Sequence, residues 1–516
     1  MTPLASTAHA AAPPRASTRP RAALAVTAAA TAIALMNYTA PMLTLPETAA
    51  AFGTPASARA WLLNGTPLGL AVLLLVAGSL ADAHGRRRVF LLGTLGLGLT
   101  TALGAFAGST AAFTAARIAQ GAASAAVLAG SLGLLAAAYP AGRDRIRATG
   151  IWGASVSAGI ALGPLLAGAL SLADWRLAYA VLGAAALVTA GTGARLLPRE
   201  EAPRAGARTG PELADDARPP LDLAGDSGPR PDLGGAVRTG RDHASGVRPG
   251  PHPDHASAAR PRPDLAGATA LGLALAALLT ALTLGRDGWL HPRVGLLLLA
   301  AVALTGLFVL VEHRSRAPMV DLALLRRPAF LASTLGALFT GLAVIGLFSV
   351  VPALLQGGAG MSPLGAAWLF VLWSGTAFVV ALQTRRLAGR VPAPYQLALG
   401  FALSAAGVLA LLGGLEGPAG SWPRLLPGLL VAGAGSGLLN AALPRLAVDS
   451  VPPERAAMGS GANNTARYIG SSAGVALMLA LATTDPDTAV LAAAALAVTG
   501  AALTLALGRR ERGASR

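Results

Sequence analysis

Residues 78–88 place one carboxylate among several arginines, between two long apolar segments. Asp82 can pair with the guanidinium groups of Arg86 and Arg87, and it can take up a proton when that pairing is broken. The expected chemistry is an ionic latch that holds neighbouring helices in one arrangement, with a fixed structural clamp as the alternative. The two glycines of the stretch permit a tight bend and a close approach of helices. The candidate latch residues are Gly78, Asp82, Gly85, Arg86 and Arg87.

Asn37, Arg117 and Gln120 are polar side chains that fall inside apolar segments, where a polar group needs a hydrogen-bonded partner or a water-filled cavity. Arg117 and Gln120 are one helical turn apart and therefore share a face, and Asn37 lies in the first apolar segment. We expect these three residues to line a cavity and to take part in a substrate or proton relay. A structural bridge between helices is the alternative for Arg117. Gln356 and Asn440 are further candidate cavity residues.

Small residues and one proline recur between residues 159 and 168. Small residues alone predict close helix packing. A proline within a helix removes a backbone hydrogen bond and bends the helix, which packing alone does not require. We therefore expect a kink that seals or gates the cavity. Its residues are Gly159, Gly163, Pro164 and Gly168.

A second polar patch, formed by Asn463, Asn464 and Arg467, lies in an apolar segment near the end of the chain. An arginine in such a segment either faces a polar cavity or marks the end of the membrane-spanning helix. The sequence leaves both interpretations open.

The composition is that of a chain whose main solvent is lipid. Of 516 residues, 54% are hydrophobic and 12% charged, and the mean hydropathy is +0.58. Cysteine is absent, which excludes disulfides and thiolate chemistry, and every basic residue is arginine. Together with the abundant alanine and glycine, this indicates a GC-rich and bacterial coding bias.

The apolar segments predict fourteen membrane-spanning helices, because each is close to the ~20 residues needed to cross the bilayer core. We expect an all-α membrane protein with a six-helix bundle at 21–197, an inserted helix pair at 267–312 and a second six-helix bundle at 328–508. The spans fall at about 22–46, 58–80, 89–108, 111–139, 147–170, 176–197, 267–285, 293–312, 328–352, 362–383, 395–415, 422–447, 458–483 and 487–508.

Residues 198–266 differ in kind from the apolar segments. They are rich in proline, glycine, aspartate and arginine, and their sequence is too polar to form a core, so they predict a disordered cytoplasmic linker. Residues 199–264 hold ten arginines against eleven acids, so the positive charge of the protein lies elsewhere. Residues 1–20 predict a disordered N-terminus and residues 509–516 a cytoplasmic tail.

The remaining arginines lie in alternate loops between the apolar segments. By the positive-inside rule this bias places both termini in the cytoplasm of a multi-pass protein of the plasma membrane. Because the charge follows topology, it gives no reason to expect a nucleic-acid partner.

The motifs together resemble the major facilitator superfamily, in particular its fourteen-span drug:proton antiporter branch. Residues 78–88 resemble the signature of the loop between spans 2 and 3, Arg117–Gly121 an R-x-x-Q-G motif, and 159–168 the antiporter motif. Residues 459–470 resemble a segment typical of that branch. The resemblance implies two six-helix bundles that alternate around a central cavity, and a latch that holds the outward-facing state.

One position departs from the resembled branch. Its first span typically reads Asp-x-Thr with a proline seven residues after the threonine. Here Thr39 and Pro46 match, but the acid is replaced by Asn37, which cannot carry a proton. No carboxylate lies well inside any predicted span, so Asp82 becomes the leading candidate for a coupling protonation.

We therefore expect a secondary active transporter that exports drug-like or secondary-metabolite compounds and is coupled to protons. Its expected partners are a small amphipathic organic substrate, protons and the lipid bilayer, and it is expected to act as a monomer. We expect no metal site and no cofactor, and no cluster of catalytic residues indicates an enzyme. An uncoupled facilitator or nutrient importer is the alternative within transport. A non-transporting membrane receptor or scaffold is the alternative from another class.

Overall fold

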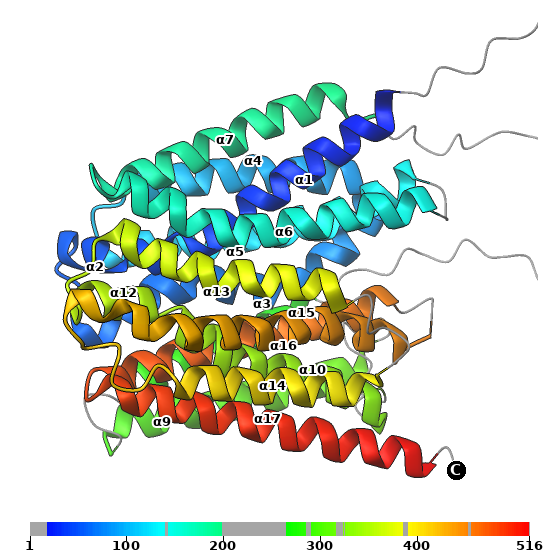
Figure 1. Ribbon diagram of the computed structural model, residues 1–516. Helices are drawn as coiled ribbons and strands as arrows, with labels where there is room; N and C mark the ends of the chain where they lie inside the picture. Colours follow the sequence, from blue (N-terminus) through cyan, green and yellow to red (C-terminus); the bar gives the residue numbers. More distant parts are fainter. Residues whose placement is uncertain are drawn as a thin grey trace, which may run out of the picture. The chain divides into compact units, whose positions relative to one another are not determined.

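The computed structural model of the protein describes residues 18–139, 143–198, 265–284, 290–315, 324, 326–384, 391–452 and 456–514. All regular structure in these residues is helical, and they contain no strand (Figure 1). The all-α class predicted from the apolar segments is therefore confirmed. Of the linker expected at 198–266, residues 199–264 lie outside the described residues, and helix α8 already begins at Leu265. Most of the N-terminal segment expected at 1–20 also lies outside them.

In the region of the predicted N-terminal bundle, the helices run from Thr18 to Leu196. The first predicted span is divided at Ala40 into α1 and α2, because Pro41 begins a new helix. The bundle consists of α1 (Thr18–Thr39), α2 (Pro41–Ala51), α3 (Arg59–His84), α4 (Arg86–Ala105), α5 (Thr110–Ala138), α6 (Arg143–Leu170) and α7 (Trp175–Leu196).

The C-terminal bundle begins with an interrupted helix. The span predicted at 328–352 contains a π-helical segment, η4, between two short helices, and it continues to Gly357. The bundle consists of α10 (Pro328–Phe339), η4 (Thr340–Ile345), α11 (Gly346–Phe348), α12 (Val351–Gly357), α13 (Pro363–Gln383), α14 (Ala393–Leu409), α15 (Leu426–Asp449), α16 (Ala456–Ala482) and α17 (Pro486–Ala514).

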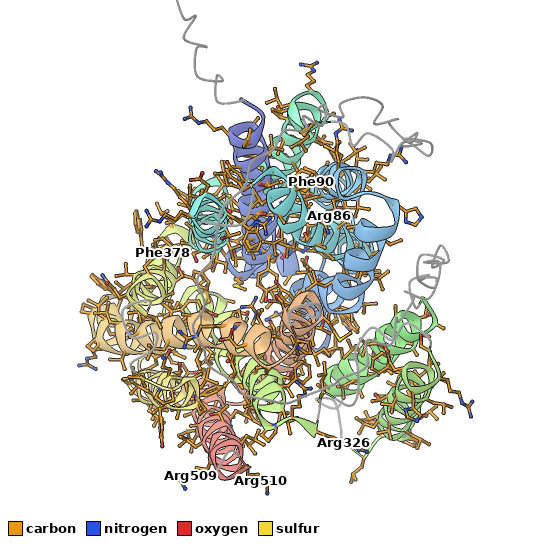
Figure 2. All side chains as sticks on the ribbon, turned by 90° about the vertical axis from the view of Figure 1, so that its right-hand side faces the viewer. Arg86, Phe90, Arg326, Phe378, Arg509 and Arg510 are labelled. Carbon is orange, nitrogen blue, oxygen red and sulfur yellow. The ribbon has the colours of Figure 1, made fainter. Side chains whose placement is uncertain are left out.

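Two helices, α8 (Leu265–Leu284) and α9 (Pro292–Arg314), lie in the region where an inserted pair is expected, 267–312, and their assignment as an insertion stays a prediction. They pack on each other, and α8 also contacts α3 and α16. Figure 2 shows this green pair at the margin of the helices when they are viewed end on.

Eleven helices among the described residues are long and apolar enough to cross a membrane, and two further apolar helices, Ala266–Leu282 and Ala393–Leu409, are shorter. These findings support a membrane protein, while the count of fourteen spans stays a prediction. The last helix runs on to Ala514, so part of the tail expected at 509–516 is helical.

The two bundles contact each other mainly where α3 packs on α16, α6 on α13, and α2 on α12 and α13. In Figure 1, α2 and α12 lie at the left end of the helices, whereas α1 begins and α17 ends at the right. Figure 2 views the molecule from that right-hand end, where Arg86, Arg326, Arg509 and Arg510 are labelled. We call this the arginine end, and the other the opposite end.

Candidate functional site

Arg117 is fully buried inside the N-terminal bundle, where it joins α5 to α1. Its Nη2 donates a hydrogen bond to the backbone oxygen of Asn37 at 2.8 Å, and its Nη1 donates to Oε1 of Gln120. Gln120 in turn donates from Nε2 to Oδ1 of Asn37 at 2.7 Å. Thr101 and Thr66 complete the network through hydrogen bonds to Gln120. The sequence prediction that these three residues act together is consistent with this geometry.

A proline explains why Arg117 finds a backbone partner here. In a continuous helix, the carbonyl of Asn37 would accept from the N–H of residue 41, four positions later. That residue is Pro41, which has no N–H. The carbonyl is therefore free to accept from the Arg117 guanidinium, and a charged donor satisfies it more strongly than a neutral one.

Asn37, Arg117 and Gln120 do not line the central pocket described below. Instead the Arg117 guanidinium lies 5.9 Å from the ring centroid of Tyr179, whose hydroxyl is 2.8 Å from Oγ1 of Thr44. The geometry thus favours the structural bridge, the alternative noted for Arg117, over a place on the cavity wall.

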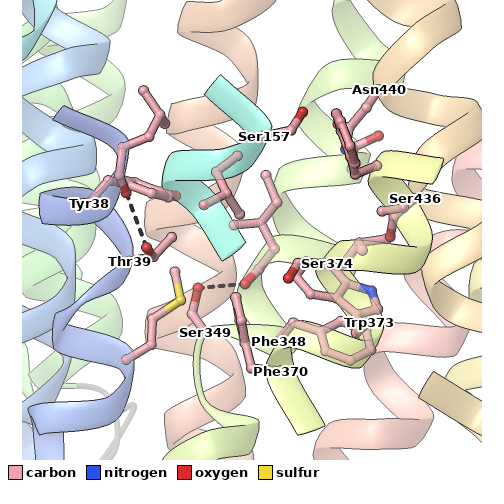
Figure 3. Close-up of a pocket in the computed structure, with 18 of the residues that line it drawn as sticks. Tyr38, Thr39, Ser157, Phe348, Ser349, Phe370, Trp373, Ser374, Ser436 and Asn440 are labelled. Carbon is pink, nitrogen blue, oxygen red and sulfur yellow. Dashed lines mark hydrogen bonds between the residues drawn. The ribbon is translucent and has the colours of Figure 1, made fainter. Parts of the chain in front are cut away.

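A pocket does lie between the two bundles (Figure 3). The pocket contains about 860 Å³ that is free of protein atoms, and part of this space is open to solvent. The centre of a water molecule can occupy only about 100 Å³ of it, so the pocket is narrow. The lining comes from α1, α2 and α6 of one bundle and from η4, α11, α13, α15 and α16 of the other. A drug-sized ligand would therefore require the pocket to widen.

The walls of the pocket are mainly aromatic and small polar side chains. Phe348 and Trp373 are stacked with ring centroids 4.2 Å apart, and Phe370 meets Trp373 edge to face at 5.2 Å. In Figure 3 these three rings lie together, with Tyr38 and Thr39 across from them on α1. The π-helical segment η4 contributes Thr340, Val344 and Ile345. Such segments interrupt helices preferentially at functional sites.

Among the described residues that line this pocket, Arg467 is the one that carries a charge. It lies well inside the candidate span Met458–Ala482, so the interpretation as a marker of the helix end is not supported. Its Nη2 donates to Oδ1 of Asn464 at 2.9 Å, and its guanidinium lies 5.5 Å from the ring centroid of Tyr468. Asn463 instead faces α10, where Nδ2 donates to the backbone oxygen of Ser333 at 2.9 Å. Of the other residues suggested from sequence, Asn440 lines the pocket and Gln356 does not.

The glycines of the 159–168 motif lie where helices approach each other closely. A Cβ at Gly163 would stand 2.7 Å from the backbone oxygen of Met36 and would also collide with Thr39 of α1. Gly159 likewise faces α1, while a Cβ at Gly168 would stand 2.9 Å from the backbone oxygen of Pro363, on α13 of the other bundle. Pro164 lies inside α6, which remains one helix from Arg143 to Leu170. Close packing is therefore part of the role of this motif.

The bundles are joined by hydrogen bonds from the middle of the helices to the opposite end. Gln356 donates from Nε2 to the backbone oxygen of Leu43 at 3.0 Å, and Asn64 donates to the backbone oxygen of Ser472 at 2.9 Å. The hydroxyls of Tyr38 and Ser471 are 2.9 Å apart beside the pocket. In the direction of the arginine end, the pocket lining extends to Ala381, two residues before α13 ends. The pocket thus extends toward the arginine end.

In the 78–88 stretch, the structure places the bend at Gly85, whose φ of +96° suits glycine. Arg87 donates to the backbone oxygens of Ala194 and Leu197, at the end of α7, and Arg86 to that of Gly133. Cations at the end of a helix stabilise it. The close approach expected at Gly78 is wrong, because no described atom lies within 4 Å of where its Cβ would stand. The side chain of Asp82 lies outside what the structure describes.

Glu47 is a carboxylate whose surroundings the sequence did not reveal. It follows the candidate span Pro20–Thr39, it is half-buried, and its Oε2 is buried without a hydrogen-bond partner. In the sequence, the feature that could have indicated a half-buried carboxylate is its position directly after Pro46, where the apolar segment ends.

A second pocket lies at the opposite end, lined by residues such as Pro46, Arg59, Gly357 and Glu416. The volume that the centre of a water molecule can occupy is about 580 Å³ in this pocket, which is larger than in the first pocket. It lies at the ends of helices and in loops, whereas the first pocket lies at mid-helix between the bundles. We therefore take the first, called the central pocket below, as the candidate site.

A helical membrane protein with two bundles around a mid-helix pocket has the architecture of a secondary transporter. Residues 27–475 match the major facilitator superfamily, and the chain belongs to it. The fold agrees with solved structures that cover 96% of the chain. A bacterial homologue of the human lysosomal transporter Spinster, inward-facing and occupied, has a TM-score of 0.61 at 13% identity over 98% of its chain. The human organic anion transporter MFSD10 has a TM-score of 0.56 at 16% identity over 100% of its chain.

Curated relatives share more of the sequence. The puromycin resistance protein pur8 of Streptomyces alboniger is 30% identical, over 89% of this chain and 81% of its own. The probable actinorhodin transporter of Streptomyces coelicolor is 29% identical, over 89% of this chain and 71% of its own. These relatives are efflux and resistance transporters, and the superfamily is one of transporters rather than enzymes.

Proposed function

We propose that this protein exports drug-like organic compounds or secondary metabolites across a bacterial plasma membrane by alternating access. The observation that carries the proposal is the central pocket, enclosed by both bundles at mid-helix and lined by aromatic and small polar side chains. Such walls suit an amphipathic organic compound better than a sugar, which needs many hydrogen-bonding partners. The efflux relatives support the same direction of transport.

We propose a topology of fourteen spans with both termini in the cytoplasm, in which the arginine end is the cytoplasmic end. The hydrogen bonds between the bundles lie at mid-helix and toward the opposite end, and the pocket extends toward the arginine end. On this assignment the structure represents a state turned toward the cytoplasm, in which a substrate would enter before export. We propose that the protein acts as a monomer.

The export assay uses inverted membrane vesicles from cells that produce the full chain. A panel of fluorescent aromatic compounds of positive, neutral and negative charge is offered outside the vesicles, with and without a pH gradient. We expect at least one compound to accumulate inside, faster than in vesicles without the protein. Uptake of none of the panel above that background would contradict the proposal.

An uncoupled facilitator is the second candidate, and one observation favours it. The part of the central pocket's lining that the structure describes contains no carboxylate, and Asn37 stands where the resembled branch has an acid. Flux that is independent of the pH gradient would support this candidate. A scaffold role predicts instead that deletion of residues 198–266 removes function, whereas a transporter should keep its flux.

We propose that coupling, where present, uses a carboxylate near a helix end. Asp82 is the first candidate, and we expect Asp82→Asn to reduce pH-driven export at least tenfold while the protein remains in the membrane. Glu47 is the second candidate, and Glu47→Gln is tested beside Asp82→Asn. Burial raises the pKa of the Glu47 carboxyl above its ordinary value, which favours proton uptake. Glu416→Gln, at an exposed carboxylate, is the control and should change nothing. Full pH-driven export by Asp82→Asn, with loss in Glu47→Gln, would move the coupling site to Glu47.

A further inference from the structure

The positive charge in the central pocket is not balanced by any of the described residues that line it. Arg467 is the one charged residue among the lining residues, and none of them is an aspartate or glutamate. Its guanidinium donates to the neutral amide of Asn464 and lies near the ring of Tyr468. A cation held in a site of low dielectric attracts an anion strongly, and it repels a second cation.

Buried polar atoms without partners gather in the same pocket. Nε of Arg467, Nε1 of Trp373 and Oγ of Ser436 are buried and have no hydrogen-bond partner. Two of these atoms can only donate, and the hydroxyl can donate as well as accept. Buried polar groups in folded proteins normally have partners, so unpaired donors in a pocket indicate a ligand that brings acceptors.

Flat apolar walls accompany these donors. The Phe348 and Trp373 rings are stacked at an interplanar angle of 8°, and Phe370 lies against the indole. In Figure 3, Trp373 lies between Phe370 and Ser436, so the aromatic wall and the polar side chains of α13 and α15 adjoin. A planar ring system offers such a wall the largest contact area.

We propose that the central pocket selects planar aromatic compounds that carry an acidic oxygen group, a carboxylate or a phenolate, with Arg467 as its counter-ion. This proposal rests on the proposed function and names its substrate class. The Trp373 indole N–H adds a second donor to the same group of acceptors. Cationic aromatic compounds are excluded by the charge of the pocket.

The direct test measures binding to the full chain in phosphatidylcholine nanodiscs by equilibrium dialysis. The probes are anthracene-2-carboxylate, the neutral anthracene-2-carboxamide and the cationic 2-(aminomethyl)anthracene. Hydrogen bonds between charged groups are stronger than those to a neutral amide, so we expect the carboxylate to bind more than tenfold more tightly than the amide. We expect the cation to bind more weakly still.

Variants separate Arg467 from a general effect of charge. Arg467→Gln should abolish the preference for the carboxylate, and Arg467→Lys should keep part of it. Trp373→Phe retains the ring and removes the donor, so it should weaken carboxylate binding with little effect on the amide. Arg445→Gln is the matched control, because Arg445 is a half-buried arginine of α15 that does not line the pocket.

Equal binding of carboxylate and amide by the unmodified protein, no binding of any probe, or the same loss in Arg445→Gln would each overturn the proposal. The vesicle assay separates this failure from failure of the proposed function. If the vesicles export neutral or cationic aromatic compounds with no preference for the anion, the proposed substrate class is wrong, while the proposed export function still holds. Selective binding of the carboxylate in nanodiscs without export of any compound overturns the exporter and leaves the anion site.

Discussion

Gly163→Val should prevent the protein from accumulating in a folded state. A Cβ at this position would stand 2.7 Å from the backbone oxygen and 2.8 Å from Cα of Met36, so relief requires α6 and α1 to separate. Overpacking of this kind costs on the order of 3 kcal/mol, and the rigid β-branched side chain offers no alternative placement. The measurement is the yield of monodisperse protein after extraction in detergent, with the free energy of unfolding of any folded fraction.

Gly153→Val is the matched control on the same helix. Beyond the backbone of its own helix, no described atom lies within 4 Å of where a Cβ would stand at Gly153, so this variant should fold in normal yield. Equal yields for the two variants would show that the contact between α6 and α1 tolerates a side chain. The roles assigned to the glycines of the 159–168 motif would then be wrong.

Arg117→Met should destabilise the N-terminal bundle by about 3 kcal/mol, because it leaves the Asn37 carbonyl and Oε1 of Gln120 short of a buried donor. Pro41→Ala provides the test of the cause. Alanine at 41 supplies the N–H that the Asn37 carbonyl otherwise lacks, so Arg117→Met should cost less in the Pro41→Ala background.

A double-mutant cycle of unfolding free energies in mixed detergent micelles measures this coupling, which we expect to be about 1 kcal/mol. If the effects of the two substitutions on the unfolding free energy are additive, the proposed role of Pro41 in freeing the Asn37 carbonyl for Arg117 is wrong. Loss of export in a protein of unchanged stability would instead support the relay role considered for Arg117.

The helical architecture could be predicted from the sequence. Apolar segments of membrane-spanning length and the motifs at residues 78–88 and 159–168 predict an all-α transporter of the major facilitator superfamily, and the family is confirmed. The interruption at η4 was not predicted. Its cause is tertiary, since Gly341 and Gly346 allow close contact with α16, and no pattern within 328–352 marks it.

The candidate site was predicted less well, for two identifiable reasons. Arg117 was expected on a cavity wall, but its partner is a backbone carbonyl freed by a proline four residues on. That spacing of Asn37 and Pro41 is visible in the sequence and could have been used. Arg467 was left between two interpretations, although it lies nine residues inside the candidate span that begins at Met458. Which of these arginines faces the pocket depends on helix rotation, which a single sequence does not fix.

The most direct test of alternating access around the central pocket uses the absence of cysteine from the chain. Ser374→Cys places one thiol on the pocket lining, and Glu416→Cys places one on an exposed loop as the control. The measurement is the export rate, in inverted vesicles, of a compound that the unmodified protein transports, before and after alkylation with a bulky maleimide. The account predicts that alkylation stops export by Ser374→Cys, that the substrate slows the alkylation, and that Glu416→Cys is unaffected. Undiminished export by fully alkylated Ser374→Cys would contradict it.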